Sequence, residues 1–340
     1  MADYYFRLPP ITDLTTAQQS ALDETEPIAL SGGPGTGKSV VSVWRHIRNH
    51  RQDKKSLLLT YTHSLVRYLR SCCMQQDSKH AANMVRTSMA GEPVKEKFAE
   101  IIIDEAQDLP PAYYGRLIKR GYTVSYGADD SQILYKDHCT KNSEFLELFP
   151  DNRECLLDRN FRSTQNIMLF AKNAFPNMFV PNDIIEGLSS NPGSKPSLSF
   201  GGSIYLKTLR LVREFATETD NVGVLIPWRP DVIAMYNFLI KNGIDCSYYV
   251  SEDCQSSCPA IKNVHVTTYR SSKGLEFDTV ILPEFDYFYN LEKPQLREGR
   301  DVLSEQDMYV AVTRARSNLF LLNKQHSVEF DDALGNFVEQ

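Results

Sequence analysis

The sequence lacks any apolar run long enough to span a membrane, and no apolar, signal-like segment opens the chain, which begins MADYYFRLPP. It also lacks an excess of positive charge, because 37 Lys and Arg stand against 43 Asp and Glu, for a net charge of −6. This balance excludes a uniformly basic surface that binds nucleic acid by charge alone, so any such contact must be local. We expect no membrane partner and a cytoplasmic location.

Cysteine is scarce, and its spacing favours neither a disulfide framework nor a metal centre. The seven cysteines are an odd number, which favours a reducing compartment. Cys72 and Cys73 are adjacent and cannot easily bind one metal tetrahedrally, while Cys254 and Cys258 form a single CxxxC pair without a second. We interpret these residues as reduced thiols in the core or in loops, with a zinc site as the minor alternative.

The remaining composition is typical of a two-domain α/β protein. The 340 residues are 42% hydrophobic and 24% charged, enough for two domains with cores of ordinary size. Short β-branched runs alternate with amphipathic stretches, as in parallel sheets flanked by helices. A turn cluster at 149–152 predicts domains over 1–152 and 153–340. The predicted strands are Ile28–Leu30, Leu57–Tyr61, Ile101–Asp104, Thr123–Tyr126, Val222–Ile226, Val264–Thr268, Thr279–Leu282 and Leu319–Leu322.

The most specific motif is a phosphate-binding loop between a predicted strand and an amphipathic helix. Glycines in such a loop let backbone N–H groups surround phosphates, the lysine reaches the β- and γ-phosphates, and the hydroxyl ligates magnesium. A tight turn without function is the alternative, which the flanking strand and helix disfavour. The motif predicts ATP and Mg²⁺ as cofactors, and its residues are Gly32, Gly33, Pro34, Gly35, Thr36, Gly37, Lys38 and Ser39.

A second acidic element supports this site. The apolar run from Ile101 ends in Asp104 and Glu105. Asp104 would hold magnesium through its water shell, and Glu105 would polarise the attacking water. Paired acids at a strand end are commonly solvated turn residues, but the P-loop upstream requires such a partner at about this distance along the chain.

Together with further segments, these motifs resemble in order those of the UvrD/Rep-like superfamily 1 helicases, over residues from about Leu14 to Leu322. The resemblance implies two RecA-like lobes, each a mostly parallel sheet flanked by helices, with arginines of the second lobe acting on ATP held by the first. It implies a role for Gln18 of LTTAQ on adenine, Gln132 of DDSQILY at the γ-phosphate, Phe161 and Arg162 of NFRS on adenine and γ-phosphate, Glu276 of TYRSSKGLEF on the ribose, and Arg314 of YVAVTRAR as a second arginine finger.

The resemblance also suggests nucleic-acid contacts at Tyr61, Thr268 and Lys273. For Tyr61, a core tyrosine at a strand end is an equal alternative. The sequence departs from the family where Ala128 replaces glycine and where Lys136 and Asp137 occupy the region of an expected tryptophan, so the family's base-stacking platform is not matched.

The short stretches between motifs, 70–99 and 167–262, leave little room for the accessory insertions of UvrD and Rep. They predict a compact motor core. The leading hypothesis is an ATP hydrolase that translocates on or unwinds single-stranded nucleic acid, with DNA as the expected substrate. The rival is an ATPase switch gated by nucleic acid or by a protein partner such as a nuclease, without independent unwinding. A small-molecule kinase would not account for TYRSSKGLEF or YVAVTRAR.

Overall fold

The computed structural model describes residues 3–88, 96–133, 138–178, 180, 182–250, 260–286, 303–324 and 338–339. The chain divides into two compact units. We call Phe6–Phe161 the P-loop unit, and Arg162–Gln340 together with Met1–Tyr5 the C-terminal unit. The chain therefore passes between the units twice, once after Tyr5 and once after Phe161.

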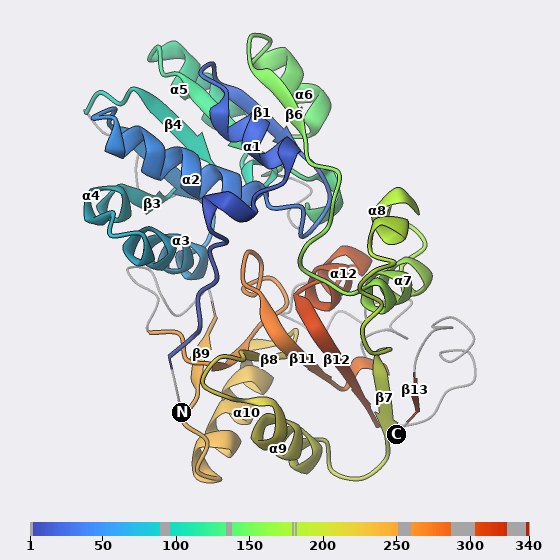
Figure 1. Ribbon diagram of the computed structural model, residues 1–340. Coiled ribbons are helices and arrows are strands. Elements are labelled where there is room, and N and C mark those ends of the chain that lie inside the picture. The colour runs from blue at the N-terminus through green and yellow to red at the C-terminus, as the bar shows by residue number, and fades with distance from the viewer. Residues whose placement is uncertain are drawn as a thin grey trace. The chain divides into compact units, whose positions relative to one another are not determined.

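The P-loop unit is built on a six-stranded parallel sheet with strand order β3-β2-β4-β5-β1-β6 (Figure 1). Its central strands are buried throughout, as expected for a parallel sheet covered by helices on its faces. The strands are β1 (Ile28–Ser31), β2 (Ser56–Thr60), β3 (Val85–Thr87), β4 (Glu100–Ile103), β5 (Val124–Gly127) and β6 (Arg153–Leu156).

Helix ends in the P-loop unit follow local capping rules. The first long helix begins after Thr15, whose side chain and that of Gln18 form a reciprocal capping box. The next begins at Lys38, after Gly37 in the left-handed conformation. The helices are α1 (Thr16–Asp23), α2 (Lys38–Arg51), α3 (His63–Gln75), α4 (Lys79–Asn83), α5 (Pro111–Lys119) and α6 (Asn142–Leu148), with short 3₁₀ turns at Ile11–Asp13, Ala106–Asp108 and Asp130–Gln132.

The C-terminal unit repeats this architecture on a seven-stranded parallel sheet with order β13-β7-β12-β11-β8-β10-β9. Apolar side chains of α9, α10 and the central strands form a core cluster in this unit. The strands are β7 (Ser197–Phe200), β8 (Val222–Leu225), β9 (Ser247–Tyr249), β10 (Val264–Thr267), β11 (Phe277–Pro283), β12 (Ala315–Asn323) and β13 (Val338–Glu339). The helices are α7 (Gln165–Ala174), α8 (Asn182–Gly187), α9 (Ile204–Phe215), α10 (Arg229–Lys241) and α12 (Glu305–Val312).

The predicted fold class is confirmed, since two mostly parallel sheets flanked by helices are present. Each of the eight predicted strands corresponds to an observed strand. The P-loop unit continues past the expected junction at residues 152 and 153 as far as Phe161. The reason is β6, which begins at Arg153 and pairs with β1, so that Ile28 lies beside Arg153 and Ser31 beside Leu156.

Within the described ranges, no helix is both long and apolar enough to cross a membrane. Cys72 and Cys73 are buried free thiols, and burial raises the pKa of Cys73 to about 12. Cys254 and Cys258 lie outside the described residues. Among the side chains that the structure describes, no three His, Cys, Asp or Glu residues come together as metal ligands.

Candidate nucleotide site

The phosphate-binding loop joins the carboxyl end of β1 to the start of α2 (Figure 1). Gly32, Gly35 and Gly37 all have positive φ angles, of 142°, 76° and 91°, which L-residues rarely adopt. A Cβ atom on Gly32 would also lie 2.3 Å from the carbonyl oxygen of Leu157. The glycines are therefore required by the path of the loop, which is the expected geometry of a phosphate cradle.

Lys38 bridges this loop from the first turn of α2. Its Nζ donates to the carbonyl oxygens of Gly32, at 2.6 Å, and Gly33, at 3.0 Å, and lies 3.5 Å from Oδ2 of Asp129. The side chain is only 8% exposed. A buried ammonium needs such compensation, and here two carbonyl dipoles and one carboxylate provide it.

Ser39 and Asp104 form the second part of the site. The Ser39 hydroxyl donates to Oδ2 of Asp104 at 2.8 Å, which brings together residues from α2 and from the end of β4. Both side chains offer hard oxygen atoms, the ligands that magnesium prefers in proteins. The donor chemistry of these two side chains therefore fits the predicted magnesium site.

Glu105 follows Asp104 in a left-handed backbone conformation, with φ of 55°. Such a conformation is uncommon for a residue with a side chain and often marks a functional site. Nε2 of the fully buried Gln107 donates to Oε2 of Glu105 at 2.6 Å, and Oε1 of Gln107 accepts from the backbone N–H of Asp129 at 3.2 Å. The carboxylate of Glu105, the predicted general base, is thus held by a buried amide.

Gln132 belongs to the same hydrogen-bond network. Its Nε2 donates to Oδ2 of Asp129 at 2.6 Å, and Oδ1 of Asp129 accepts from the N–H and hydroxyl of Ser131. The sequence analysis gave no role to Asp129, which stands inside DDSQILY, or to Gln107, which stands two residues after Glu105. Asp129 connects Gln132 to Lys38. Residues 134–137 of this motif, including Lys136 and Asp137, lie outside the described residues.

Gln18 contacts the loop from α1. Its Oε1 accepts from the N–H of Thr15 at 3.0 Å, and its Nε2 donates to the carbonyl oxygen of Thr36 at 3.0 Å. Phe161 lies at the other side of the loop, where its N–H donates to the carbonyl oxygen of Gly35 at 2.9 Å. Its side chain is 50% exposed, so the ring is accessible for stacking. Both predicted adenine contacts therefore adjoin the phosphate loop.

Arg162 and Glu276 come together in the C-terminal unit. Arg162 Nε donates to Oε1 of Glu276 at 2.7 Å, and Arg316 Nη1 donates to Oε2 at 2.8 Å. Burial alone would raise the pKa of Glu276, but nearby positive charges outweigh burial and lower this pKa to about 2, the contributors being Arg162, Arg316 and Arg314. The Glu276 carboxylate is therefore an anchor for two guanidinium groups.

Arg314 is fully buried. Its Nε donates to the carbonyl oxygen of Val310 in α12 at 3.0 Å, and its Nη2 lies 3.5 Å from the hydroxyl of Thr313. An arginine in this environment contributes to packing and to helix termination as well as charge. The sequence suggested a catalytic role for Arg314 and did not indicate this burial.

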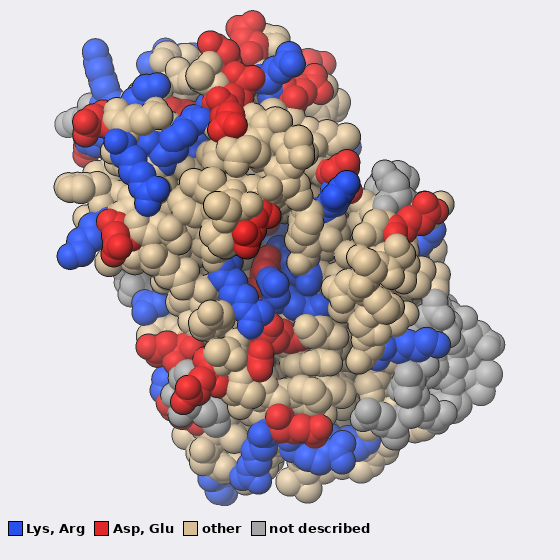
Figure 2. All heavy atoms as spheres, viewed as in Figure 1, with Lys and Arg blue, Asp and Glu red and all other residues tan. Residues whose placement is uncertain are grey.

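The three suggested nucleic-acid residues occupy different environments. Tyr61 is half-buried and packs against the core cluster of the P-loop unit, in line with the alternative of a core tyrosine. The Thr268 hydroxyl accepts from the N–H of Ser271 at 3.0 Å, which closes a turn. Lys273, in the same turn, is buried. On the face shown in Figure 2, acidic and basic side chains are interspersed on both units.

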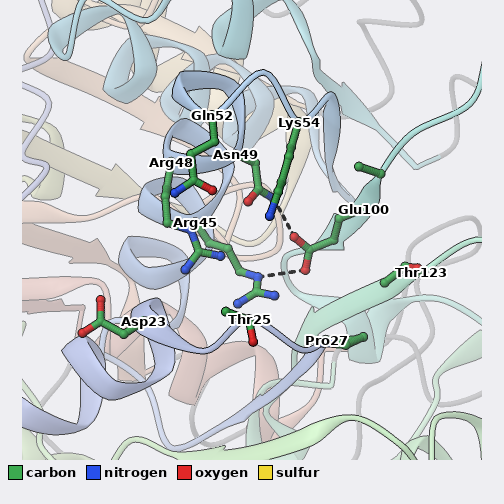
Figure 3. Close-up of a pocket in the computed structure, with 11 residues that line it drawn as sticks. Asp23, Thr25, Pro27, Arg45, Arg48, Asn49, Gln52, Lys54, Glu100 and Thr123 are labelled. Carbon is green, nitrogen blue, oxygen red and sulfur yellow. Dashed lines mark hydrogen bonds and ion pairs between the residues drawn. The ribbon is translucent and has the colours of Figure 1, made fainter.

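A polar cavity of about 430 Å³ lies at the N-terminal ends of β1, β4 and β5, whereas the phosphate-binding loop follows the carboxyl end of β1 (Figure 3). At its floor Glu100 accepts from Arg45 Nε at 2.8 Å and from Asn49 Nδ2 at 2.6 Å. The remaining Arg45 nitrogens donate to the carbonyl oxygens of Glu24 and Glu26, each at 2.7 Å. The hydrogen-bonding groups of Arg45, Asn49 and Glu100 thus have partners within the cluster. We interpret this cluster, which we call the brace, as structural: it joins α2 to the start of β4.

Comparisons with known proteins agree with this geometry. Residues 227–326 match the UvrD-like helicase C-terminal domain, and residues 27–172 match the Schlafen group 3 DNA/RNA helicase domain. An inferred ATP-dependent DNA helicase of Acanthamoeba polyphaga mimivirus is 27% identical over 244 residues, which cover 65% of this chain and 34% of that protein. The chain thus spans about a third of the length of this curated relative.

Among solved structures, the DUF1998 helicase MrfA bound to DNA is similar in fold. The match has a TM-score of 0.51 at 12% identity and covers 98% of this chain and 51% of MrfA. The fold, the order of motifs and the two helicase-domain matches lead to one conclusion. In both units the chain is similar to helicase domains, and residues 227–326 are similar to the C-terminal domain of the UvrD-like helicases.

Proposed function

We propose that this protein is an ATP-dependent motor that hydrolyses ATP with Mg²⁺ and uses the cycle to move along or unwind single-stranded DNA. The observation that carries the proposal is the meeting of Lys38, Ser39 and Asp104 at the mouth of a glycine-constrained loop, next to Glu105. This arrangement supplies a fixed cation, magnesium ligands and a general base within one unit.

In the proposed reaction, Lys38 leaves its loop carbonyls and binds the β- and γ-phosphates as they enter the cradle. Ser39 and Asp104 would hold a magnesium ion, which would neutralise phosphate charge when bound. Glu105 accepts the proton of the attacking water, and Gln107 keeps its carboxylate in place for this step. The network from Gln107 through Asp129 to Gln132 then senses the γ-phosphate.

The proposal assigns Arg162 and Arg314 to the transition state. A guanidinium group beside the γ-phosphate neutralises charge that develops during transfer and can contribute several orders of magnitude in rate. Arg162→Ala should therefore lower turnover by about a thousandfold with a much smaller loss of nucleotide affinity. Arg162→Lys should rescue poorly, because lysine lacks the forked donor geometry. Unchanged turnover would reject the assignment.

For DNA, the proposal places backbone contacts at the turn containing Thr268 and Lys273, with Tyr61 as the stacking candidate. Because the Lys273 side chain is buried, we expect the backbone of the Thr268–Lys273 turn to contact DNA in place of an exposed basic side chain. Binding of a fluorescent single-stranded oligonucleotide, with Tyr61→Ala compared with Tyr122→Ala, tests the stacking assignment. Equal affinities in the two variants would leave Tyr61 as a core residue only.

The deciding experiment measures ATP turnover with and without single-stranded DNA, then strand displacement, with Lys38→Ala as the inactive control. We expect DNA to stimulate turnover and the isolated chain to displace little strand from a blunt duplex, because the stretches between its motifs leave little room for accessory insertions. The rival function is a switch subunit gated by nucleic acid or by a partner such as a nuclease. Gating by a partner predicts ATP turnover that DNA alone does not stimulate, and gating by nucleic acid predicts DNA-stimulated turnover without movement along the strand.

A further inference from the structure

The segment Asp3–Tyr5 belongs to the C-terminal unit and contacts residues that are far from it in the sequence. Asp3 forms an antiparallel bridge with Lys262, and the N–H of Tyr4 donates to the carbonyl oxygen of Ile261 at 3.0 Å. The side chain of Asn221 binds both backbone groups of Tyr5: its Oδ1 accepts from the N–H at 2.8 Å, and its Nδ2 donates to the carbonyl oxygen at 2.9 Å. The segment is thus fixed by backbone bonds on both sides of Tyr4.

These bonds bury the side chain of Tyr4, which is only 3% exposed. Its ring meets that of Phe277 edge-on, with centroids 5.9 Å apart. Its hydroxyl donates to the carbonyl oxygen of Glu276 and accepts from the N–H of Glu276 at 3.1 Å. Burial raises the pKa of Tyr4 well above its ordinary value of 10, so the hydroxyl keeps the proton that it donates.

One side chain therefore holds both backbone groups of the residue whose carboxylate anchors Arg162 and Arg316. This contact also lies close to both points at which the chain passes between the units. The chain leaves the C-terminal unit directly after Tyr5 and re-enters it at Arg162. Tyr4, one residue before the first crossing, and Arg162, the first residue after the second crossing, both contact Glu276.

We propose that Tyr4 is a positioning residue for ATP turnover: it fixes the backbone of Glu276, and through the Glu276 carboxylate it aims Arg162. The inference rests on the proposed catalytic role of Arg162. Tyr4 touches no substrate in this scheme, so its contribution should be seen in turnover and should disappear when Arg162 is absent. A merely structural tyrosine would lower turnover equally in both backgrounds.

The test compares Tyr4→Phe, which removes only the hydroxyl, with Tyr248→Phe, the same change at a half-buried tyrosine of β9 in the same unit. We expect Tyr4→Phe to lower kcat about tenfold with the Kd for ATP nearly unchanged, the size expected for two lost hydrogen bonds that orient a catalytic group. Tyr248→Phe should leave kcat unchanged. In an Arg162→Ala background, Tyr4→Phe should add less than about a twofold loss.

Hydrogen exchange gives a readout that does not depend on catalysis. The amide of Glu276 should exchange faster in Tyr4→Phe, because its acceptor is gone, and a peptide spanning 275–278 should report this. Unchanged exchange, or a loss in kcat of the same factor with and without Arg162, overturns the proposal. If Arg162→Ala turns over ATP normally, the catalytic assignment of Arg162 fails and the aiming role of Tyr4 fails with it, while the exchange rate still decides whether Tyr4 anchors Glu276.

Discussion

Glu276 makes the stability of the C-terminal unit depend on acid in a predictable way. Its pKa is about 2 in the folded protein against an ordinary value of 4.5, because arginine charges outweigh the effect of burial. A carboxylate with a lowered folded pKa contributes stability that is complete above its unfolded pKa and is lost as pH falls through the folded value. The window for Glu276 therefore runs from about pH 4.5 down to about pH 2.

The magnitude follows from the shift. A difference of about 2.5 units corresponds to roughly 3 kcal/mol of unfolding free energy, since each unit is worth about 1.4 kcal/mol. By pH 3 the unfolded chain binds the proton almost fully and the folded one hardly at all, so about 2 kcal/mol of this is lost. The Glu276 side chain is 22% exposed, so solvent screening makes these values upper limits.

The assay is urea unfolding at pH 7 and pH 3, comparing the parent protein with Glu276→Gln. The sequence has two tryptophans, Trp44 in the P-loop unit and Trp228 in the C-terminal unit, so a Trp44→Phe background leaves Trp228 to report the C-terminal unit alone. We expect Glu276→Gln to be less stable at pH 7 and to approach the parent at pH 3. A free-energy difference that stays the same at both pH values would refute the pairing of Glu276 with its arginines.

Four further variants test the P-loop unit and Arg314. Lys38→Ala should abolish ATP hydrolysis, and near-normal turnover in a folded variant would remove the site assignment. Glu105→Gln should bind ATP and magnesium but lose at least about a hundredfold in turnover; loss of nucleotide binding would instead mark Glu105 as structural. Arg314→Ala should cost about a thousandfold in turnover and also lower the Tm, because the side chain is fully buried, and a small change in steady-state kinetics would contradict the finger role. Glu100→Gln should destabilise the P-loop unit by about 3 kcal/mol in urea unfolding, because it leaves Arg45 buried without its carboxylate, and a change under about 1 kcal/mol would contradict the brace.

The strands and the phosphate loop could be predicted because local sequence determines them. Buried parallel strands need unbroken β-branched or leucine runs, and only a few residue types fit the constrained positions between Gly32 and Ser39. The same holds for Asp104, whose place at a strand end follows from the apolar run before it. Its distance from Ser39 then follows from the parallel order of β1 and β4 on either side of β5.

Long-range contacts could not be predicted in the same way. β6 is mostly exposed, so the hydrophobic pattern gave no sign that Arg153–Leu156 extends the first sheet. Tyr4 and Glu276 are separated by 272 positions, and nothing near Tyr4 in the sequence indicates its partner. The resemblance of YVAVTRAR to a helicase motif gave Arg314 its catalytic role, while the burial of its side chain depends on how α12 packs.

Gln18 has a consequence for nucleotide selectivity. Its amide already closes the capping box of α1 and holds the carbonyl oxygen of Thr36, so the group expected to recognise the base also shapes the loop that receives the phosphates. Changing the preferred base by mutation at Gln18 would therefore disturb the binding of every nucleoside triphosphate, whatever its base. Evolution of a different nucleotide preference in this scaffold would have to begin elsewhere, for example at the exposed ring of Phe161.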